Sequence, residues 1–445
     1  MGTIILTVTG FVSRIIGFFY RIYLSRLFGE EGMGIYQLLN PVLALSFSLT
    51  AAGYQTAISK FVAERSAKEH HASFLPMLIG LSISLPLSLL CTGVVFCCSD
   101  FIAVHMLLEP RTASMLRILS FSIPFSAVHS CINGYFYGTK KTGIPAASQL
   151  MEQITRVGCV YGVSVFAISQ GKTPSLSVAV LGLVVGELVS MIISIAAIYG
   201  CYIKEHSQHP GISALHSAQS AGRSRMLPVY GSLLSMALPL TANRIVLNLL
   251  QSVESVSIPA QLRSYGYDTA TALSVYGVLT GMAMPLIFFP NALTNSVAVL
   301  LLPVISESYA LGDMRAVRQA TLRTVKYCCI LGFLCMGCFG LFGKWAGTTL
   351  FNSPLAGHFI TTLSFICPFI YLDTTLSSIL QGLGMAGRIF LMNVVCLLLR
   401  LAFVFLAVPR FGITGYLWGI LASQLVLSTL YLLCLYRFGK TKLKS

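Results

Sequence analysis

Five arginines lie inside apolar stretches of the sequence and are the side chains best placed to do chemistry: Arg14, Arg21, Arg156, Arg244 and Arg400. An arginine at the centre of a bilayer costs about 2.5–3.5 kcal/mol on insertion scales, so it normally faces a bundle interior or water. Arg14 and Arg21 are two helical turns apart and share one helix face, in a stretch without acids. Guanidinium groups bind phosphate oxygens through paired hydrogen bonds, so this face is a candidate anion site. The alternative for Arg21 is that its head reaches the outer membrane interface.

The remaining intramembrane charges have two open interpretations. Arg156 follows Glu152 by one helical turn, a spacing that allows the two to neutralise each other. Arg400 has no acid near it in the sequence. Single acids also occur in three other apolar stretches: Glu187, Glu254 and Asp373. Each acid either pairs with an arginine across the protein interior or takes up a coupling proton.

The composition requires a membrane setting for these charges. Of 445 residues, 56% are hydrophobic and only 10% are charged, whereas soluble domains carry about 25% charged residues. Mean hydropathy is +0.81. These values exclude an ordinary cytosolic enzyme and a disordered chain.

Apolar runs predict about twelve transmembrane helices, each near the 20 residues that a bilayer needs. Their approximate ranges are 3–28, 34–58, 74–99, 113–137, 146–169, 176–202, 228–254, 271–302, 322–346, 356–382, 388–409 and 413–437. With the N-terminus in the cytoplasm, the cytoplasmic loops and tail hold 17 of the 29 basic residues and the opposite side holds 7. This bias predicts a multi-pass protein of the cytoplasmic membrane with both termini inside, and it accounts for most of the +15 net charge without nucleic acid.

An internal repeat predicts two six-helix lobes. LSFSIPF at 119–125 matches LSFICPF at 363–369, and at the same offset Gly138 matches Gly382 and Arg156 matches Arg400. The expected divisions are an N-terminal lobe over 1–203, a cytoplasmic linker over 204–226 and a C-terminal lobe over 227–445. Because six is an even number, the lobes form a parallel pseudo-two-fold repeat around a central cavity.

No cofactor and no metal site are expected. Most of the 13 cysteines lie in apolar runs as small packing residues. A membrane-embedded glycosyl or phosphate transferase would need paired acids or a metal site, yet no D-x-D or D-D pair occurs. His70 and His71 form the only pair of adjacent histidines, and their loop position favours simple solvation. The sequence therefore predicts a protein that is not an enzyme.

Several motifs resemble those of a known family. They are S-R-x-x-G-x-x-x-R at 13–21, RLFGEEGMGIYQLLNP at 26–41, AISKFVAE at 57–64, A-x-x-Q-x-x-E-Q-x-x-R at 146–156 and LLPVISE at 301–307. Together they resemble the polysaccharide and lipid II flippases of the multidrug/oligosaccharidyl-lipid/polysaccharide exporter superfamily, including its sporulation members. The resemblance covers nearly the whole chain.

The resemblance implies a fold like that of the multidrug (MATE) transporters and alternating-access movement of an undecaprenyl-pyrophosphate-linked saccharide. Lipid II in spore cortex or cell wall synthesis is the expected cargo, and cell-wall or cortex synthesis proteins are expected partners. Arg14 and Arg21 would contact the pyrophosphate. Many relatives have fourteen transmembrane helices, of which the last two form a groove for the prenyl tail. How a chain of twelve helices would hold this tail stays open. Leu279 replaces a basic residue of the related eighth span, so one pyrophosphate or sugar contact is either missing or supplied elsewhere, by Arg244 or Arg400.

A cation-coupled multidrug antiporter is the alternative within the same superfamily. Such exporters take cationic drugs and commonly carry an aspartate in the first helix. Arg14 and Arg21 in this helix count against that function.

Overall fold

The computed structural model describes residues 2–69, 74–208 and 223–442, and over these residues the regular structure is entirely helical. Ten of the described helices are long and apolar enough to cross a membrane, or eleven if the bent pair Val8–Gln37 and Asn40–Glu64 counts as one span. The prediction of an all-α polytopic membrane protein is therefore confirmed. The number twelve stays a prediction.

The chain divides into two compact units. The first unit comprises Met1–Gly17 and Leu39–Leu249, and the second comprises Phe18–Leu38 and Leu250–Ser445. The helices α1 (Gly2–Gln37) and α11 (Arg223–Tyr265) each contribute residues to both units. The predicted lobes, 1–203 and 227–445, follow the internal sequence repeat and have different boundaries from these two units. The lobes therefore stay a prediction.

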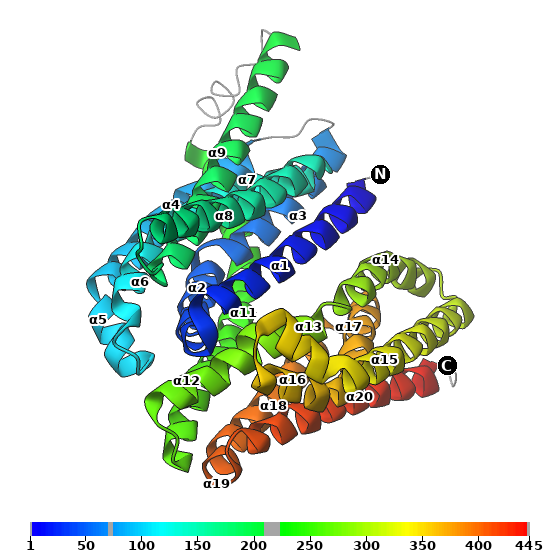
Figure 1. Cartoon of the computed structure of the whole chain (residues 1–445). Coiled ribbons are helices and arrows are strands. Elements are labelled where there is room, and N and C mark those ends of the chain that lie inside the picture. The colour runs from blue at the N-terminus through cyan, green and yellow to red at the C-terminus, as the bar shows by residue number, and fades with distance from the viewer. Residues whose placement is uncertain (1, 70–73, 209–222, 443–445) are drawn as a thin grey trace. The chain divides into compact units, whose positions relative to one another are not determined.

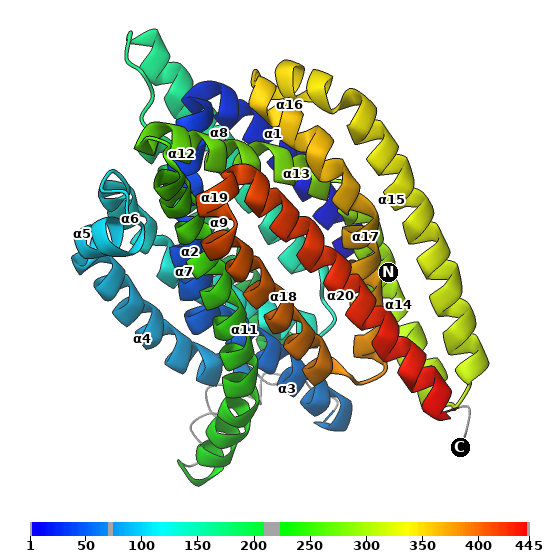
Figure 2. The same cartoon turned by 90° about the horizontal axis from the view of Figure 1, so that it is seen from below.

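The first unit is a helix bundle in which α7 takes a central place. Its elements after α1 are α2 (Asn40–Phe47), η1 (Ser48–Ala52, a π-helix), α3 (Gly53–Glu69), α4 (Leu75–Cys97), α5 (Ser99–Phe101), η2 (Ile102–Met106), α6 (Thr112–Ser120), α7 (Ser122–Gly138), α8 (Gly143–Ser169) and α9 (Ser177–Gln208). Figures 1 and 2 show α7 beside α4, and α7 also packs on α3 and α9. Its buried side chains include Cys131, Ile132, Tyr135 and Phe136, which form one apolar core with α3 and α4.

The second unit continues α11 with a second bundle. Its elements are α12 (Thr269–Gly277), η3 (Val278–Ala283, a π-helix), α13 (Met284–Phe288), α14 (Asn291–Ala310), α15 (Met314–Phe351), α16 (Pro354–Leu363), η4 (Ser364–Ile366), α17 (Cys367–Gly382), α18 (Ala386–Leu406), α19 (Val408–Phe411) and α20 (Ile413–Lys442). The helices α14, α15 and α20 pack around α17 (Figure 2). Leu376, Ile379 and Leu380 of α17 are fully buried in this core.

Four expected spans differ from the structure. The first and second, 3–28 and 34–58, correspond to the bent pair Val8–Gln37 and Asn40–Glu64, which counts as at most one span. The expected eighth span, 271–302, is divided at Pro290 into the candidate spans Thr269–Phe288 and Asn291–Ala310, because proline cannot donate the backbone hydrogen bond that would continue a helix. The expected fifth span corresponds to α8, which is not among the ten candidate spans of the described chain. The predicted linker 204–226 is partly helical, since α9 reaches Gln208 and α11 begins at Arg223. Its middle, 209–222, lies outside the described residues.

Matching glycines of the repeat make matching close contacts, one in each unit. A Cβ atom at Gly138 would lie 2.7 Å from the Ser59 carbonyl oxygen on α3. A Cβ atom at Gly382 would lie 3.0 Å from the Ile305 Cβ on α14. An added Cβ would clash at Gly138 and would be tight at Gly382. The two glycines thus lie at close helix contacts, of α7 on α3 and of α17 on α14.

Candidate functional site

The first helix presents two arginines without ion-pair partners. Arg14 is exposed and Arg21 is half-buried, and neither forms an ion pair with any residue in the described ranges. The backbone of α1 is helical up to Gly29, with Arg14 in the part that belongs to the first unit and Arg21 in the part that belongs to the second. A guanidinium group without an ion-pair partner can bind an anion with several oxygens, such as a diphosphate.

The C-terminal part of α1 is fixed within the second unit. Arg26 donates hydrogen bonds from Nε to the Leu350 carbonyl oxygen (2.9 Å) and from Nη2 to the Thr349 carbonyl oxygen (2.6 Å), at the end of α15. Glu30 accepts a hydrogen bond from the Ser353 hydroxyl (2.5 Å), and the same hydroxyl caps α16 by accepting from the Ala356 amide. These bonds satisfy backbone groups that helix ends leave open. They also fix the orientation of the helix that carries Arg21.

A bend in α1 lies between these anchors. Gly29 has φ 70° and ψ −173°, a conformation that favours glycine, and the helix resumes after it. Beyond the bend Gly34 lies against α12, where an added Cβ would clash with the Leu273 carbonyl. The motif at 26–41 therefore has a structural role. Arg26 and Glu30 bind the second unit's helix ends, Gly29 forms the bend, and Gly34 allows close packing on α12.

Arg400 is neutralised by an acid from another helix. Its Nε and Nη2 donate to the two carboxylate oxygens of Glu254 at 2.7 and 2.5 Å, and the Tyr416 hydroxyl donates to the same carboxylate at 2.8 Å. Glu254 is buried (2% exposed), so its charge needs these partners. The structure thus brings together two predicted site residues, one from α11 and one from α18, that are 146 positions apart.

Arg244 resembles the arginines of α1 rather than Arg400. It is exposed on α11 and has no ion pair with a described residue. Like Arg14 it belongs to the first unit. It is therefore available to bind an anion.

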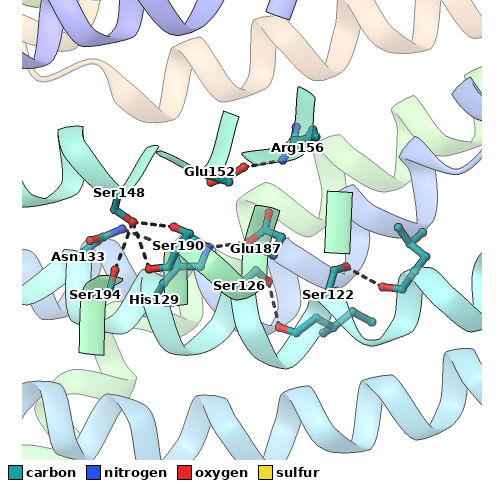
Figure 3. Close-up of polar contacts among 12 residues, drawn as sticks. Ser122, Ser126, His129, Asn133, Ser148, Glu152, Arg156, Glu187, Ser190 and Ser194 are labelled. Atoms are coloured by element: carbon teal, nitrogen blue, oxygen red, sulfur yellow. Dashed lines mark hydrogen bonds and ion pairs between the residues drawn. The ribbon is translucent and has the colours of Figure 1, made fainter. Parts of the chain in front are cut away.

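A polar cluster in the first unit joins three other predicted site residues with one that the sequence analysis missed (Figure 3). Arg156 Nη2 lies 2.5 Å from Glu152 Oε1, and Glu187 Oε2 lies 2.8 Å from the Nε2 atom of His129. The side chains come from α7, α8 and α9, which pack on one another. A histidine within an apolar stretch was the available signal for His129.

Hydroxyl groups extend this cluster along α8 and α9. Ser148 on α8 is within hydrogen-bonding distance of Ser190 (2.6 Å) and Ser194 (3.3 Å) on α9, and all three are fully buried. Figure 3 shows them on the Asn133 side of the cluster. Pairing of the hydroxyls satisfies polar groups that water cannot reach.

Asp373 lies apart from the paired charges. It is buried on α17, and its Oδ1 accepts a hydrogen bond from the Ser428 hydroxyl at 2.5 Å. Its Oδ2 has no hydrogen-bond partner among the described residues. The structure brings it together with no other predicted site residue by a hydrogen bond or ion pair in the described ranges.

The chain belongs to the polysaccharide biosynthesis protein family, whose model matches residues 1–309. Among characterised relatives, it is 29% identical to stage V sporulation protein B of Bacillus subtilis (strain 168), over 97% of this chain and 82% of that protein. It is 22% identical to the lipid II flippase MurJ of the same organism, over 86% of this chain and 72% of that protein. These matches confirm the resemblance stated from the sequence motifs.

Solved structures show the same fold. An inward-facing multidrug resistance MATE family transporter of the MOP superfamily matches with a TM-score of 0.75 and 16% identity, over 97% of this chain and 96% of that one. The lipid II flippase MurJ in an inward closed conformation matches with a TM-score of 0.70 and 15% identity, over 97% and 87% of the two chains. The predicted MATE-like fold is therefore confirmed.

Proposed function

We propose that this protein is a flippase for a lipid-linked saccharide of the undecaprenyl-pyrophosphate type. The observation that carries the proposal is the contrast among the intramembrane arginines. Arg156 and Arg400 are neutralised by acids, whereas Arg14, Arg21 and Arg244 have no ion pair among the described residues. Uncompensated guanidinium groups in a membrane segment are costly, and such residues mark substrate pathways.

The relatives support the same class of cargo. One of them is named a lipid II flippase and another a sporulation protein, and the family is one of polysaccharide biosynthesis. We infer that the cargo is a peptidoglycan precursor such as lipid II, used in spore cortex or cell wall synthesis. Proteins of that synthesis are the partners that this function requires.

The mechanism that fits this cargo is alternating access in the cytoplasmic membrane, with both termini inside. Arg14 and Arg21 bind the pyrophosphate from the cytoplasmic side, and the lipid tail remains in the bilayer. Arg244 contacts phosphate or sugar. The protein then opens to the other side and releases the cargo, so it acts as a transporter and not as an enzyme.

A lipid II flip assay in proteoliposomes tests this function. Wild-type protein should move fluorescent lipid II, and Arg14→Ala and Arg21→Ala should each lose most of that activity. Arg318→Ala is the matched control, because Arg318 is exposed near the start of α15 and outside the site. Full activity in both α1 variants would refute the site, and inactivity of correctly folded wild type on every lipid-linked saccharide would refute the function.

The likeness to MATE transporter structures keeps a cation-coupled multidrug antiporter as the second candidate. It would need cavity acids for cationic drugs, and on α1 the intramembrane positions are arginines instead. Drug susceptibility of a strain lacking the protein separates the two functions. Increased susceptibility with normal lipid II movement would favour the antiporter.

A further inference from the structure

Three potential metal ligands converge inside the first unit. His129 on α7, Glu152 on α8 and Glu187 on α9 each offer one ligand atom, and these atoms all lie within 4.8 Å of one another. All three residues are half-buried, with side-chain exposures of 13% for His129 and 17% for each glutamate. Figure 3 shows the side chains approaching from three separate helices.

The geometry and the donor atoms suit a divalent transition-metal ion. Zinc binds histidine nitrogen and carboxylate oxygen at about 2.0–2.2 Å, which places neighbouring ligand atoms of a tetrahedral site roughly 3–3.6 Å apart. The His129 Nε2 and Glu187 Oε2 atoms are 2.8 Å apart and need only a small outward shift. An imidazole donor favours transition metals over sodium, magnesium or calcium, which prefer oxygen ligands alone.

Asn133 provides an independent sign that the histidine is prepared for a ligand. It is buried (7% exposed), its Nδ2 lies 3.4 Å from His129 Nδ1, and its Oδ1 has no hydrogen-bond partner among the described residues. The two ends of an amide are interchangeable by rotation. With the amide turned, Oδ1 accepts the Nδ1 proton and leaves the Nε2 lone pair facing the carboxylates. This is the arrangement that orients metal-bound histidines.

The local charge also calls for a cation. With neutral His129, the two carboxylates and the Arg156 guanidinium leave a net charge of −1 within the apolar bundle. Arg156 donates to Oε1 of Glu152, so the other carboxylate oxygen remains for an ion. Either a bound cation or a proton on His129 would offset the excess charge.

We propose that His129, Glu152 and Glu187 form a binding site for a divalent transition-metal ion such as Zn²⁺. The ion would link α7, α8 and α9 and thereby stiffen the first unit. This site does not depend on the proposed cargo. It differs from the expectation of no metal site, which rested on cysteine patterns and short motifs. These three ligands are far apart in the sequence and form no such motif.

Metal titration of the full-length protein tests the proposal. Chelator-treated protein in detergent is titrated with Co²⁺ and followed by visible absorption, with Zn²⁺ content measured in parallel. All variants are made in a background in which five other histidines, His70, His71, His206, His209 and His216, are replaced by alanine. The expected result is one ion per chain, with the Co²⁺ band lost and affinity reduced at least about tenfold in His129→Gln and in Glu187→Gln.

The matched control is His105→Ala, because His105 is an exposed histidine of η2 outside the cluster. It should bind the ion as the background protein does. Asn133→Ala should weaken binding less than His129→Gln while remaining monodisperse by size exclusion. The proposal is overturned if the folded background protein binds no ion, because a proton on His129 then offsets the charge. It is also overturned if His129→Gln and Glu187→Gln bind the ion as tightly as the control does.

Discussion

The two units carry polar groups at the same positions of the internal repeat but partner them differently. Arg156 and Arg400 are equivalent, and at the same sequence offset His129 corresponds to Asp373. In the first unit both groups belong to one cluster over α7, α8 and α9. In the second unit Arg400 pairs with Glu254 and Asp373 with Ser428, in two separate contacts. Polar side chains at matching sequence positions therefore have different partners in the two units.

The difference concerns how completely each arginine is neutralised. The Arg400 pair is bidentate, and a tyrosine completes the shell of the buried Glu254 carboxylate. The Arg156 pair is an i,i+4 contact on one helix, within reach of a second carboxylate and a histidine. We infer that the second unit uses its pair to fix α11 against α18, whereas the first unit holds its arginine in a polar cluster shared by three helices.

Loss of one partner of the second unit's pair should have the largest effect on stability. Arg400→Ala leaves the Glu254 carboxylate buried without its charge partner, and we expect a loss of about 3–5 kcal/mol. Thermal unfolding in detergent measures it. The double variant Glu254→Leu/Arg400→Leu should recover part of the loss because it buries no lone charge. A single variant as stable as wild type would show that the pair is dispensable.

The equivalent change in the first unit should cost less. Arg156→Ala removes a charge-assisted hydrogen bond worth about 1.5–3 kcal/mol, but Glu152 still lies near His129. The same unfolding measurement, run beside Arg400→Ala, checks the order of the two effects. A larger loss for Arg156→Ala would reverse the comparison between the units.

The matching glycines test whether the two units pack alike. Gly138→Ala should destabilise by about 1–3 kcal/mol, because the new methyl group meets the Ser59 backbone carbonyl at 2.7 Å. Gly382→Ala meets side-chain atoms of Ile305 at 3.0 Å, which can shift slightly, so its cost should be smaller. Gly143→Ala is the control, since a Cβ there has open space. Equal stability of all three variants would contradict the equivalence.

The smallest effect is expected from the tyrosine of the second unit. Tyr416→Phe removes one hydrogen bond to Glu254 and leaves both arginine contacts in place. We expect a loss of about 1.5 kcal/mol. Unfolding of Tyr416→Phe beside Arg400→Ala measures it, and a loss as large as that of Arg400→Ala would mean that the hydroxyl, rather than the guanidinium, holds the carboxylate.

Much of the fold can be predicted from the sequence, because the length of each apolar run and the positions of repeated glycines can be read directly along the chain. Apolar runs predict most membrane helices, and the offset of the repeat pairs Gly138 with Gly382. The break at Pro290 was harder to predict, since an apolar run continues through it. The helix α8 carries Ser148, Glu152 and Arg156, which contact polar side chains within the bundle and lower the hydropathy of the helix.

The candidate site was less predictable because pairing depends on packing between distant segments. The Glu152–Arg156 contact follows from helical spacing, whereas Glu254 and Arg400 meet only through tertiary structure. His129 is hard to predict as a site residue, because its acidic partners lie on other helices and far away in the sequence. The anchoring role of Arg26 could not be predicted from composition, since its partners are backbone carbonyl oxygens at the end of another helix.

The central claim is that the uncompensated arginines of α1, rather than the paired ones, hold the pyrophosphate. The most direct measurement is the dissociation constant of purified protein for undecaprenyl pyrophosphate, compared among wild type, Arg14→Ala/Arg21→Ala and Arg156→Gln. Each charge-assisted contact is worth about 1.5–3 kcal/mol, so the double variant should bind at least about a hundredfold more weakly. Arg156→Gln should bind nearly as wild type does. Unchanged affinity in the double variant, or a greater loss in Arg156→Gln, would contradict the account.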